Sequence, residues 1–187
     1  MHSTKELYRI GRGPSSSHTM GPVFACQTAL EQNPDADYFE ITLFGSLAKT
    51  GKGHRTDYAI EQTFKNIPAK IIFNTSKTNL PHPNTMEIAA FKANSEIYRK
   101  TFLSVGGGAV EALGENTQTA DLVYKEKNFS EIERYCETHS ITLPKYVEMH
   151  EGGEIREYMK NVWHRMNETV SNGLSHSGII PGGLNIK

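Results

Sequence analysis

The sequence predicts an α+β protein in which helices pack on a mixed β-sheet, followed by a short all-α segment. Strand-like and helix-like segments alternate along most of the chain, and two strand-like neighbours, residues 86–93 and 97–105, have the spacing of a hairpin. Across Ile155–Val170, apolar residues recur at helical spacing. We therefore expect a sheet-containing domain at residues 1–148 and, at residues 149–187, the start of an all-α domain that is cut short.

The expected helices have recognisable ends. A helix is predicted from Val23 through Leu30, with a Ser or Thr hydroxyl available as its N-cap, and residues 33–35 (NPD) stop it. Helical spacing also marks residues 56–66 and 129–139. The long C-terminal helix is expected to end at Gly173.

The strand and loop predictions rest on the period of the apolar residues and on Gly and Pro. Apolar and polar residues alternate over residues 39–43, which predicts a half-buried strand, and residues 69–73 and 120–125 are also predicted as strands. Residues 45–53 are predicted to be a Gly-rich loop. Residues 80–84 cannot be helical, because each proline disfavours the α region for the residue before it.

Composition excludes several classes of protein. Of the 187 residues, 37% are hydrophobic and 22% are charged, which is typical of a soluble globular protein. The net charge is −1 and there is no basic stripe, so no nucleic-acid partner is expected. Because the sequence has no long apolar run, neither a signal peptide nor a membrane span is expected. The two cysteines, Cys26 and Cys136, are too few for a disulfide framework, which favours the reducing cytoplasm.

Three segments combine Gly, Pro or Ser with a histidine. The first is GPSSSHTMGP, residues 13–22, in which consecutive hydroxyls precede an imidazole and a helix start. Hydroxyls and backbone N–H groups would form a cradle for an anion such as a carboxylate, with a titratable base beside it. The alternative is a serine-rich N-cap followed by an exposed histidine.

The second and third segments are GSLAKTGKGHRTD, residues 45–57, and LPHPNTM, residues 80–86. Gly51-Lys52-Gly53-His54 resembles a phosphate loop only superficially, because the GxxxxGK[ST] spacing fails, and Thr56 or Asp57 could simply cap a helix. In the third segment two prolines hold the backbone around a histidine, a rigidity that suits catalytic loops but does not require a function. The three histidines show neither HxH nor HxxxH spacing, which disfavours a metal triad.

Taken together and in this order, these segments and SVGGG at residues 104–108 resemble the β domain of bacterial iron–sulfur L-serine dehydratases. The C-terminal part, residues 159–184, resembles the opening of that family's α domain. Arg55 stands where the family more often has Gly. The resemblance implies the α+β fold that the family shares with the allosteric substrate-binding domain of some phosphoglycerate dehydrogenases.

The resemblance also implies a function. Members of the family are lyases (L-serine ammonia-lyases) of amino-acid catabolism and gluconeogenesis that use a 4Fe-4S cluster in place of pyridoxal phosphate. His18 is expected to be the base, and His54 and Asp57 to support it. The residues expected to bind the substrate are Ser15, Ser16, Ser17, Thr19, His82 and Asn84. No metal ligand is expected in this chain, because the cysteines that ligate the cluster belong to the later part of the α domain.

The expected partners are L-serine, the α domain or α subunit of the same enzyme and, in the complete protein, further copies of the chain. By this account the chain alone is inactive. The shared fold supplies a rival hypothesis, a regulatory module that binds serine or another anion without catalysis. A binding module needs no base at position 18, which distinguishes the two.

Overall fold

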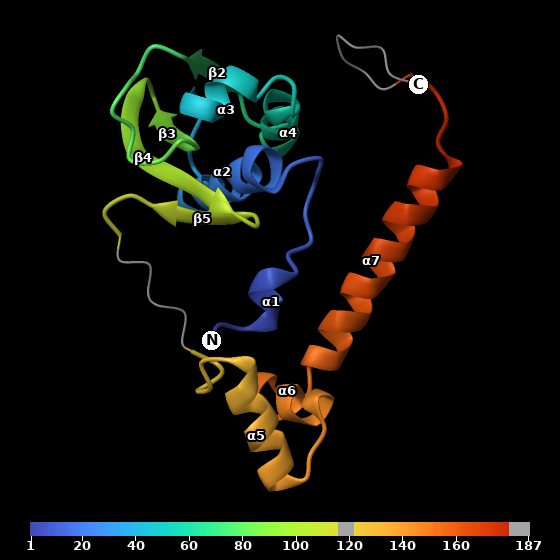
Figure 1. The fold of residues 1–187 in the computed structure, drawn as a ribbon. Helices are drawn as coiled ribbons and strands as arrows, with labels where there is room; N and C mark the ends of the chain where they lie inside the picture. The colour runs from blue at the N-terminus through green and yellow to red at the C-terminus, as the bar shows by residue number, and fades with distance from the viewer. Residues whose placement is uncertain (116–121, 180–187) are drawn as a thin grey trace. The chain divides into compact units, whose positions relative to one another are not determined.

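The computed structural model describes residues 1–115 and 122–179. The chain divides into two compact units, and both are drawn in Figure 1. Residues 11–117 form the first, called the sheet unit below, and residues 1–10 together with 118–187 form the second, called the helical unit.

The sheet unit contains one five-stranded sheet in the order β2-β1-β3-β4-β5. Strands β1 and β2 are parallel, and the other neighbouring pairs are antiparallel. The predicted mixed sheet and the α+β class are therefore confirmed. The strands are β1 (Tyr38–Phe44), β2 (Ala69–Asn74), β3 (Thr85–Lys92), β4 (Ser95–Gly106) and β5 (Ala109–Ala112).

Three α-helices cover one face of this sheet. Phe39, Ile41 and Leu43 of β1 are opposite Ala90, Ile88 and Met86 of β3, and all six side chains are buried. Because alternate residues of a strand point to opposite faces, these six share one face, and helix residues complete the same core. The helices are α2 (Gly21–Gln32), α3 (Gly45–Thr50) and α4 (Thr56–Thr63), and a π-helix, η1 (Ser16–Met20), leads directly into α2.

Several predicted elements of the sheet unit need correction. The predicted loop at residues 45–53 begins with helix α3, which starts at Gly45 in the left-handed region (φ 53°). A Cβ at Gly45 would lie 2.4 Å from the carbonyl oxygen of Pro83, so this glycine is needed for the close approach of the two loops. Helix α2 has no side-chain cap, because the π-helix precedes it, and strand β5 was not predicted.

The helical unit contains α1 (Thr4–Leu7), α5 (Phe129–His139), α6 (Leu143–Glu151) and α7 (Ile155–Ser175). Helix α5 has the predicted bounds, α7 ends two residues beyond Gly173, and α6 was not predicted. No strand forms at residues 122–125, which corrects that part of the predicted strand, and residues 120–121 lie outside the described residues. Tyr124, Ile132 and Tyr146 form the small core of this unit.

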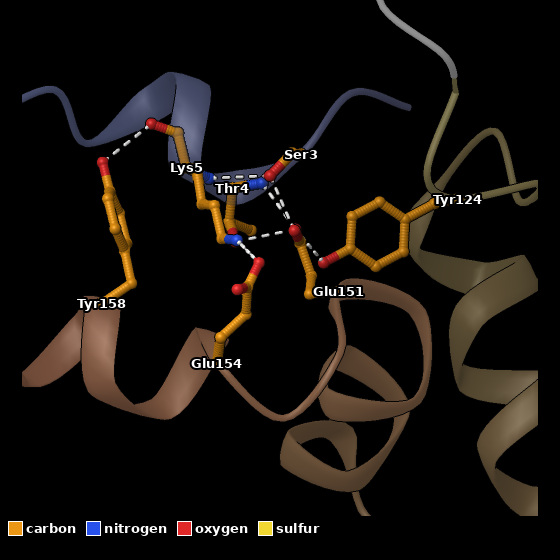
Figure 2. A network of polar contacts seen from close by, with 7 residues as sticks. All are labelled: Ser3, Thr4, Lys5, Tyr124, Glu151, Glu154 and Tyr158. Atoms are coloured by element: carbon orange, nitrogen blue, oxygen red, sulfur yellow. Dashed lines mark hydrogen bonds and ion pairs between the residues drawn. The ribbon is translucent and has the colours of Figure 1, made fainter.

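A partly buried carboxylate, that of Glu151, joins the first residues of the chain to the end of α6 (Figure 2). Glu151 accepts hydrogen bonds from the hydroxyl of Ser3 at 2.6 Å, from the backbone N–H of Thr4 at 2.7 Å and from the hydroxyl of Tyr124 at 2.7 Å. Burial acts to raise the pKa of Glu151, but these hydrogen bonds outweigh it and lower the pKa to about 2. The charged carboxylate is therefore part of what holds the helical unit together.

The boundary expected at residues 148/149, between the β domain and the start of the α domain, remains a prediction. Within the helical unit, residues on both sides of that boundary belong to the same compact group. None of the helices in the described ranges is long and apolar enough to cross a membrane.

Candidate functional site

The serine-rich segment folds into a π-helix whose first turn is closed by Ser15. The Ser15 hydroxyl accepts a hydrogen bond from the backbone N–H of His18 at 3.1 Å, and the Ser15 carbonyl accepts from the N–H groups of Thr19 and Met20 at 3.1 and 3.0 Å. π-Helical turns are rare and are frequently found at functional sites. Here the turn places the imidazole of His18 toward the start of α3.

Both ring nitrogens of His18 contact hydroxyl groups. Nε2 lies 2.9 Å from the Oγ atom of Ser46, and Nδ1 lies 3.1 Å from the Oγ atom of Ser17. A hydroxyl can donate or accept, so either neutral tautomer satisfies both contacts. His18 therefore has no ring nitrogen free of a protein contact.

A second imidazole lies beside the first. The ring centroids of His18 and His54 are 4.6 Å apart and the rings are tilted by 31°. His54 Nδ1 lies 3.0 Å from the carbonyl oxygen of Thr50, which can only accept a hydrogen bond, so neutral His54 carries its proton on Nδ1 and an open lone pair on Nε2.

Two threonines connect the backbones that carry these histidines. The buried hydroxyl of Thr19 donates to the carbonyl of His54 at 3.0 Å. The buried hydroxyl of Thr56 donates to the carbonyl of His18 at 2.5 Å. These reciprocal bonds hold the His18–His54 pair in a defined arrangement.

The surroundings of His18 favour the neutral form of its imidazole. Partial burial lowers the pKa of His18, and the positive charge that His54 can carry lowers it further, while the contact with Ser46 acts in the opposite direction. A histidine held neutral near physiological pH can accept a proton.

The proline-rich loop meets the same place. The backbone N–H of Ser46 donates to the carbonyl of Pro83 at 2.8 Å. Within this loop the N–H of Asn84 donates to Nδ1 of His82 at 3.1 Å, and the hydroxyl of Thr85 donates to the carbonyl of His82 at 2.6 Å. Ser46 thus contacts both the π-helix and the proline-rich loop, so all three histidine segments converge on one end of the sheet unit.

Two buried polar atoms beside this loop have no hydrogen-bond partner among the described residues: Oδ1 of Asn84 and Oγ of Ser104. The amide orientation of Asn84 is set by its Nδ2, which donates to the carbonyl of Ser104 at 3.3 Å. Oδ1 is therefore an open acceptor. Buried polar atoms without partners are expensive, and a ligand that donates a hydrogen bond would satisfy this one.

Most of the residues expected at the site come together, with two exceptions. Ser16 is exposed on the π-helix. The Asp57 side chain makes a local contact, accepting a hydrogen bond from the backbone N–H of Tyr58 at 2.9 Å. The sequence-based assignment did not include Ser46 or Ser104. Both lie inside segments that the sequence singles out, but their partners come from other segments.

The thiols are not arranged to hold a cluster. Cys26 is fully buried in the core of the sheet unit, where burial raises its pKa, and Cys136 belongs to α5 of the helical unit. Across residues 1–115 and 122–179, no group of three or more His, Cys, Asp and Glu side chains is arranged to hold a metal ion.

Fold and site together define a class of domain in which a helix-covered mixed sheet presents one imidazole on a hydroxyl-rich turn and a second imidazole beside it. A family model described as serine dehydratase beta chain matches residues 3–66 and 61–116. The chain belongs to this family.

Relatives of the chain carry matching names. It is 28% identical to L-serine dehydratase 1 of Escherichia coli and 30% identical to L-serine dehydratase of Haemophilus influenzae; each alignment covers 100% of this chain and 52% of the relative. It is 29% identical to L-serine dehydratase of Helicobacter pylori strain J99, over 98% of this chain and 51% of the relative. The chain thus spans about half the length of these relatives.

Proposed function

We propose that this chain is the base-bearing part of an L-serine dehydratase, an L-serine ammonia-lyase that converts L-serine to pyruvate and ammonia. The observation that carries the proposal is the His18–His54 pair, held by reciprocal hydrogen bonds from Thr19 and Thr56 to the backbone, in a chain of the serine dehydratase family. The relatives that cover the whole chain are named L-serine dehydratases, so the rival hypothesis of a binding module without catalysis is not favoured.

The reaction is a β-elimination that needs a positioned base. A proton leaves Cα of serine and hydroxide leaves Cβ, which produces aminoacrylate; this tautomerises to an imine, and water hydrolyses the imine to pyruvate and ammonia. The Cα proton of an amino acid is only weakly acidic, so its removal requires a neutral base in direct reach. Partial burial lowers the pKa of His18, which supports a role for the pair in that step.

The two histidines can divide the work in two ways. His18 is the base by resemblance. The hydrogen bonds support the reverse assignment, because His54 offers a free Nε2 lone pair while both nitrogens of His18 are held by Ser17 and Ser46. In the second assignment His18 positions the substrate.

We assign the polar groups of serine to the remaining residues. Oδ1 of Asn84 would accept a hydrogen bond from the substrate ammonium, since it is a buried acceptor with no partner in the described chain. The hydroxyl of Ser17 would bind the carboxylate, with Ser15 and Thr19 shaping the turn. His82 would order the loop that carries Asn84.

The 4Fe-4S cluster that the resemblance implies does not fit the residues of this chain, because one thiol is fully buried and the other belongs to a different unit. We place its ligands in the part of the relatives that this chain does not span, supplied by an α domain or α subunit, and the isolated chain is then inactive. We further propose that the complete enzyme is a cytoplasmic homo-oligomer.

The test combines the purified chain with the complementary half of a relative, under anaerobic conditions, and measures pyruvate formed from L-serine. Formation of pyruvate that requires both halves supports the proposal. The matched control is the chain carrying both His18→Ala and His54→Ala, which should assemble equally and produce no pyruvate. Assembly without turnover in the unmodified pair would contradict the proposal.

A further inference from the structure

A small polar pocket lies in the sheet unit, between the segment that precedes the π-helix and the start of α4. Its volume is about 190 Å³. Arg12 and Arg55 line it together with Thr19 and Tyr58. None of these except Thr19 has a role in the proposed dehydration, and Thr19 contacts the pocket from the turn that carries His18.

The two arginines converge on one aromatic ring. The guanidinium carbon of Arg12 lies 5.1 Å from the ring centroid of Tyr58, and that of Arg55 lies 4.4 Å from it. A guanidinium that contacts a ring through its face keeps the N–H groups at its edge available for hydrogen bonds. Tyr58 therefore contacts both guanidinium groups and leaves their N–H groups available to a ligand.

These positive charges have no anionic partner in the described part of the chain. None of the ion pairs formed within residues 1–115 and 122–179 includes Arg12 or Arg55. By contrast, Arg99 in the same unit binds both Glu87 and Glu96. Two like charges gathered at one pocket repel each other, and an anion bound between them removes that repulsion.

The backbone of Arg55 is also set for this position. Its φ is 55° and its ψ is 34°, the left-handed conformation that is uncommon for residues other than glycine. The backbone N–H of Arg55 donates to the carbonyl of Lys52 at 3.1 Å, and its carbonyl accepts from the N–H of Ala59 at 3.0 Å. Unusual backbone conformations of this kind cluster at sites that bind ligands.

Charge and size together indicate the ligand. Two guanidiniums match a compact anion with two negative charges, and arginine forms paired hydrogen bonds with the oxygens of phosphate. A pocket of about 190 Å³ holds a phosphate group but not a nucleotide, since sites for larger ligands typically occupy about 300–1,000 Å³. Serine has no net charge, so it does not satisfy this pair of cations.

We propose that Arg12 and Arg55 form a binding site for a compact oxyanion of the phosphate class, separate from the serine site. Two of the residues that line the pocket, Thr19 and Arg55, directly follow His18 and His54 in the sequence. The source is either free inorganic phosphate or the phosphate group of a small metabolite.

The test is a titration of the full 187-residue chain with inorganic phosphate at constant ionic strength, followed by NMR. Saturable shifts of the amides of Arg12, Thr19, Arg55 and Tyr58 are expected. Arg12→Gln and Arg55→Gln should each weaken phosphate binding by at least about tenfold, in line with the loss of one charged hydrogen-bonding partner. Lys65→Gln, which removes an exposed charge elsewhere in the sheet unit, should leave the affinity unchanged.

Further arms separate this site from the serine site. Phosphate binding should persist in His18→Ala and His54→Ala, and L-serine should not displace phosphate, so failure of the proposed dehydratase function would leave this result intact. A small phosphorylated metabolite such as phosphoglycolate that binds more tightly than phosphate identifies the metabolite source, and equal or weaker binding identifies free phosphate. No saturable shift, displacement by L-serine, or equal weakening in Lys65→Gln would overturn the proposal.

Discussion

At the scale of single residues, the environment of His18 combines partial burial with a neighbouring imidazole. Burial disfavours a positive charge on His18, and a positive charge on His54 disfavours it further, so His18 is held neutral by its surroundings. The hydroxyls of Ser17 and Ser46 orient the ring without supplying a negative charge. The pair is thus suited to accept a proton and poorly suited to remain doubly charged.

The first prediction follows from this arrangement. In an NMR pH titration of the chain, the midpoint for His18 should lie below the ordinary value of 6.5. His54→Gln should raise that midpoint, because it removes the neighbouring positive charge. The same shift makes stability depend on pH. The folded chain binds this proton less tightly than the unfolded chain, so the free energy of unfolding should fall as the pH drops through 6.5. A wild-type midpoint at or above 6.5 would contradict the account.

The second prediction concerns Gly21, where the π-helix passes into α2. A Cβ at this position would lie 2.1 Å from Oγ and 2.9 Å from Cβ of Ser104. Gly21→Ala should therefore destabilise the sheet unit by about 1–3 kcal/mol, since the buried Ser104 must shift. The control is Gly53→Ala, whose Cβ would meet nothing closer than 3.4 Å. Urea unfolding measures both variants, and equal midpoints would refute the packing argument.

The residues of the site were only partly predictable from the sequence. His18, His54 and His82 stand out because each lies in a short segment rich in Gly, Pro or Ser. The contact of Ser46 with His18 was not predictable, because the two are 28 residues apart and meet only through the fold. The open acceptor on Asn84 depends likewise on Ser104, 20 residues further along the chain.

At the scale of helices and strands, periodicity predicted the strongly alternating elements and missed some of the short ones. Strand β1 and helix α5 have clear periods and were predicted nearly to the residue. Helix α3 was predicted as part of a loop because residues 45–53 are rich in glycine. It forms because Leu47 and Ala48 are buried in the core of the sheet unit. The four residues of β5 are too few to show a period, and their pairing with β4 defines them.

The third prediction tests the connection between α1 and α6 through Glu151. Glu151→Gln removes the charge that accepts hydrogen bonds from Ser3, Thr4 and Tyr124. Hydrogen bonds to a charged group contribute about 1.5–3 kcal/mol each, so the helical unit should lose stability, and the amides of residues 4–8 should exchange faster with deuterium. Glu154→Gln, at an exposed ion pair with Lys5, is the control and should change little.

The same carboxylate predicts a pH dependence. The pKa of Glu151 is about 2 in the folded chain against 4.5 for an ordinary glutamate, so its contribution is complete above pH 4.5 and is lost as the pH falls toward 2. In Glu151→Gln this part of the acid destabilisation should disappear. An unchanged acid unfolding curve in that variant would show that the network does not contribute.

At the scale of the whole molecule, the chain spans about half the length of its relatives. Among the described residues, one helix has an exposed apolar face. Helix α7 carries exposed Trp163, Met166, Val170 and Leu174, which share one side of the helix by their spacing. We expect the complementary half of the enzyme to cover this face, because large exposed apolar patches mark interaction sites.

The fourth prediction uses Trp163, the only tryptophan in the chain. When the complementary half of a relative is added, the fluorescence of Trp163 should shift to shorter wavelength as the ring leaves water. Leu174→Asp should weaken that association, whereas Asn172→Asp, on the opposite side of α7 by helical spacing, should not. An unchanged emission spectrum on assembly would show that this face is not the contact.

The central claim is that this chain supplies the base for serine dehydration, and the turnover number of the reconstituted enzyme tests it most directly. With the complementary half present and L-serine saturating, His18→Ala and His54→Ala are compared with the unmodified chain. The account predicts that kcat falls about 10²–10⁴-fold in the variant that lacks the base, while the other variant mainly raises KM. If both variants keep kcat within a few-fold of the unmodified chain, the base does not belong to the His18–His54 pair.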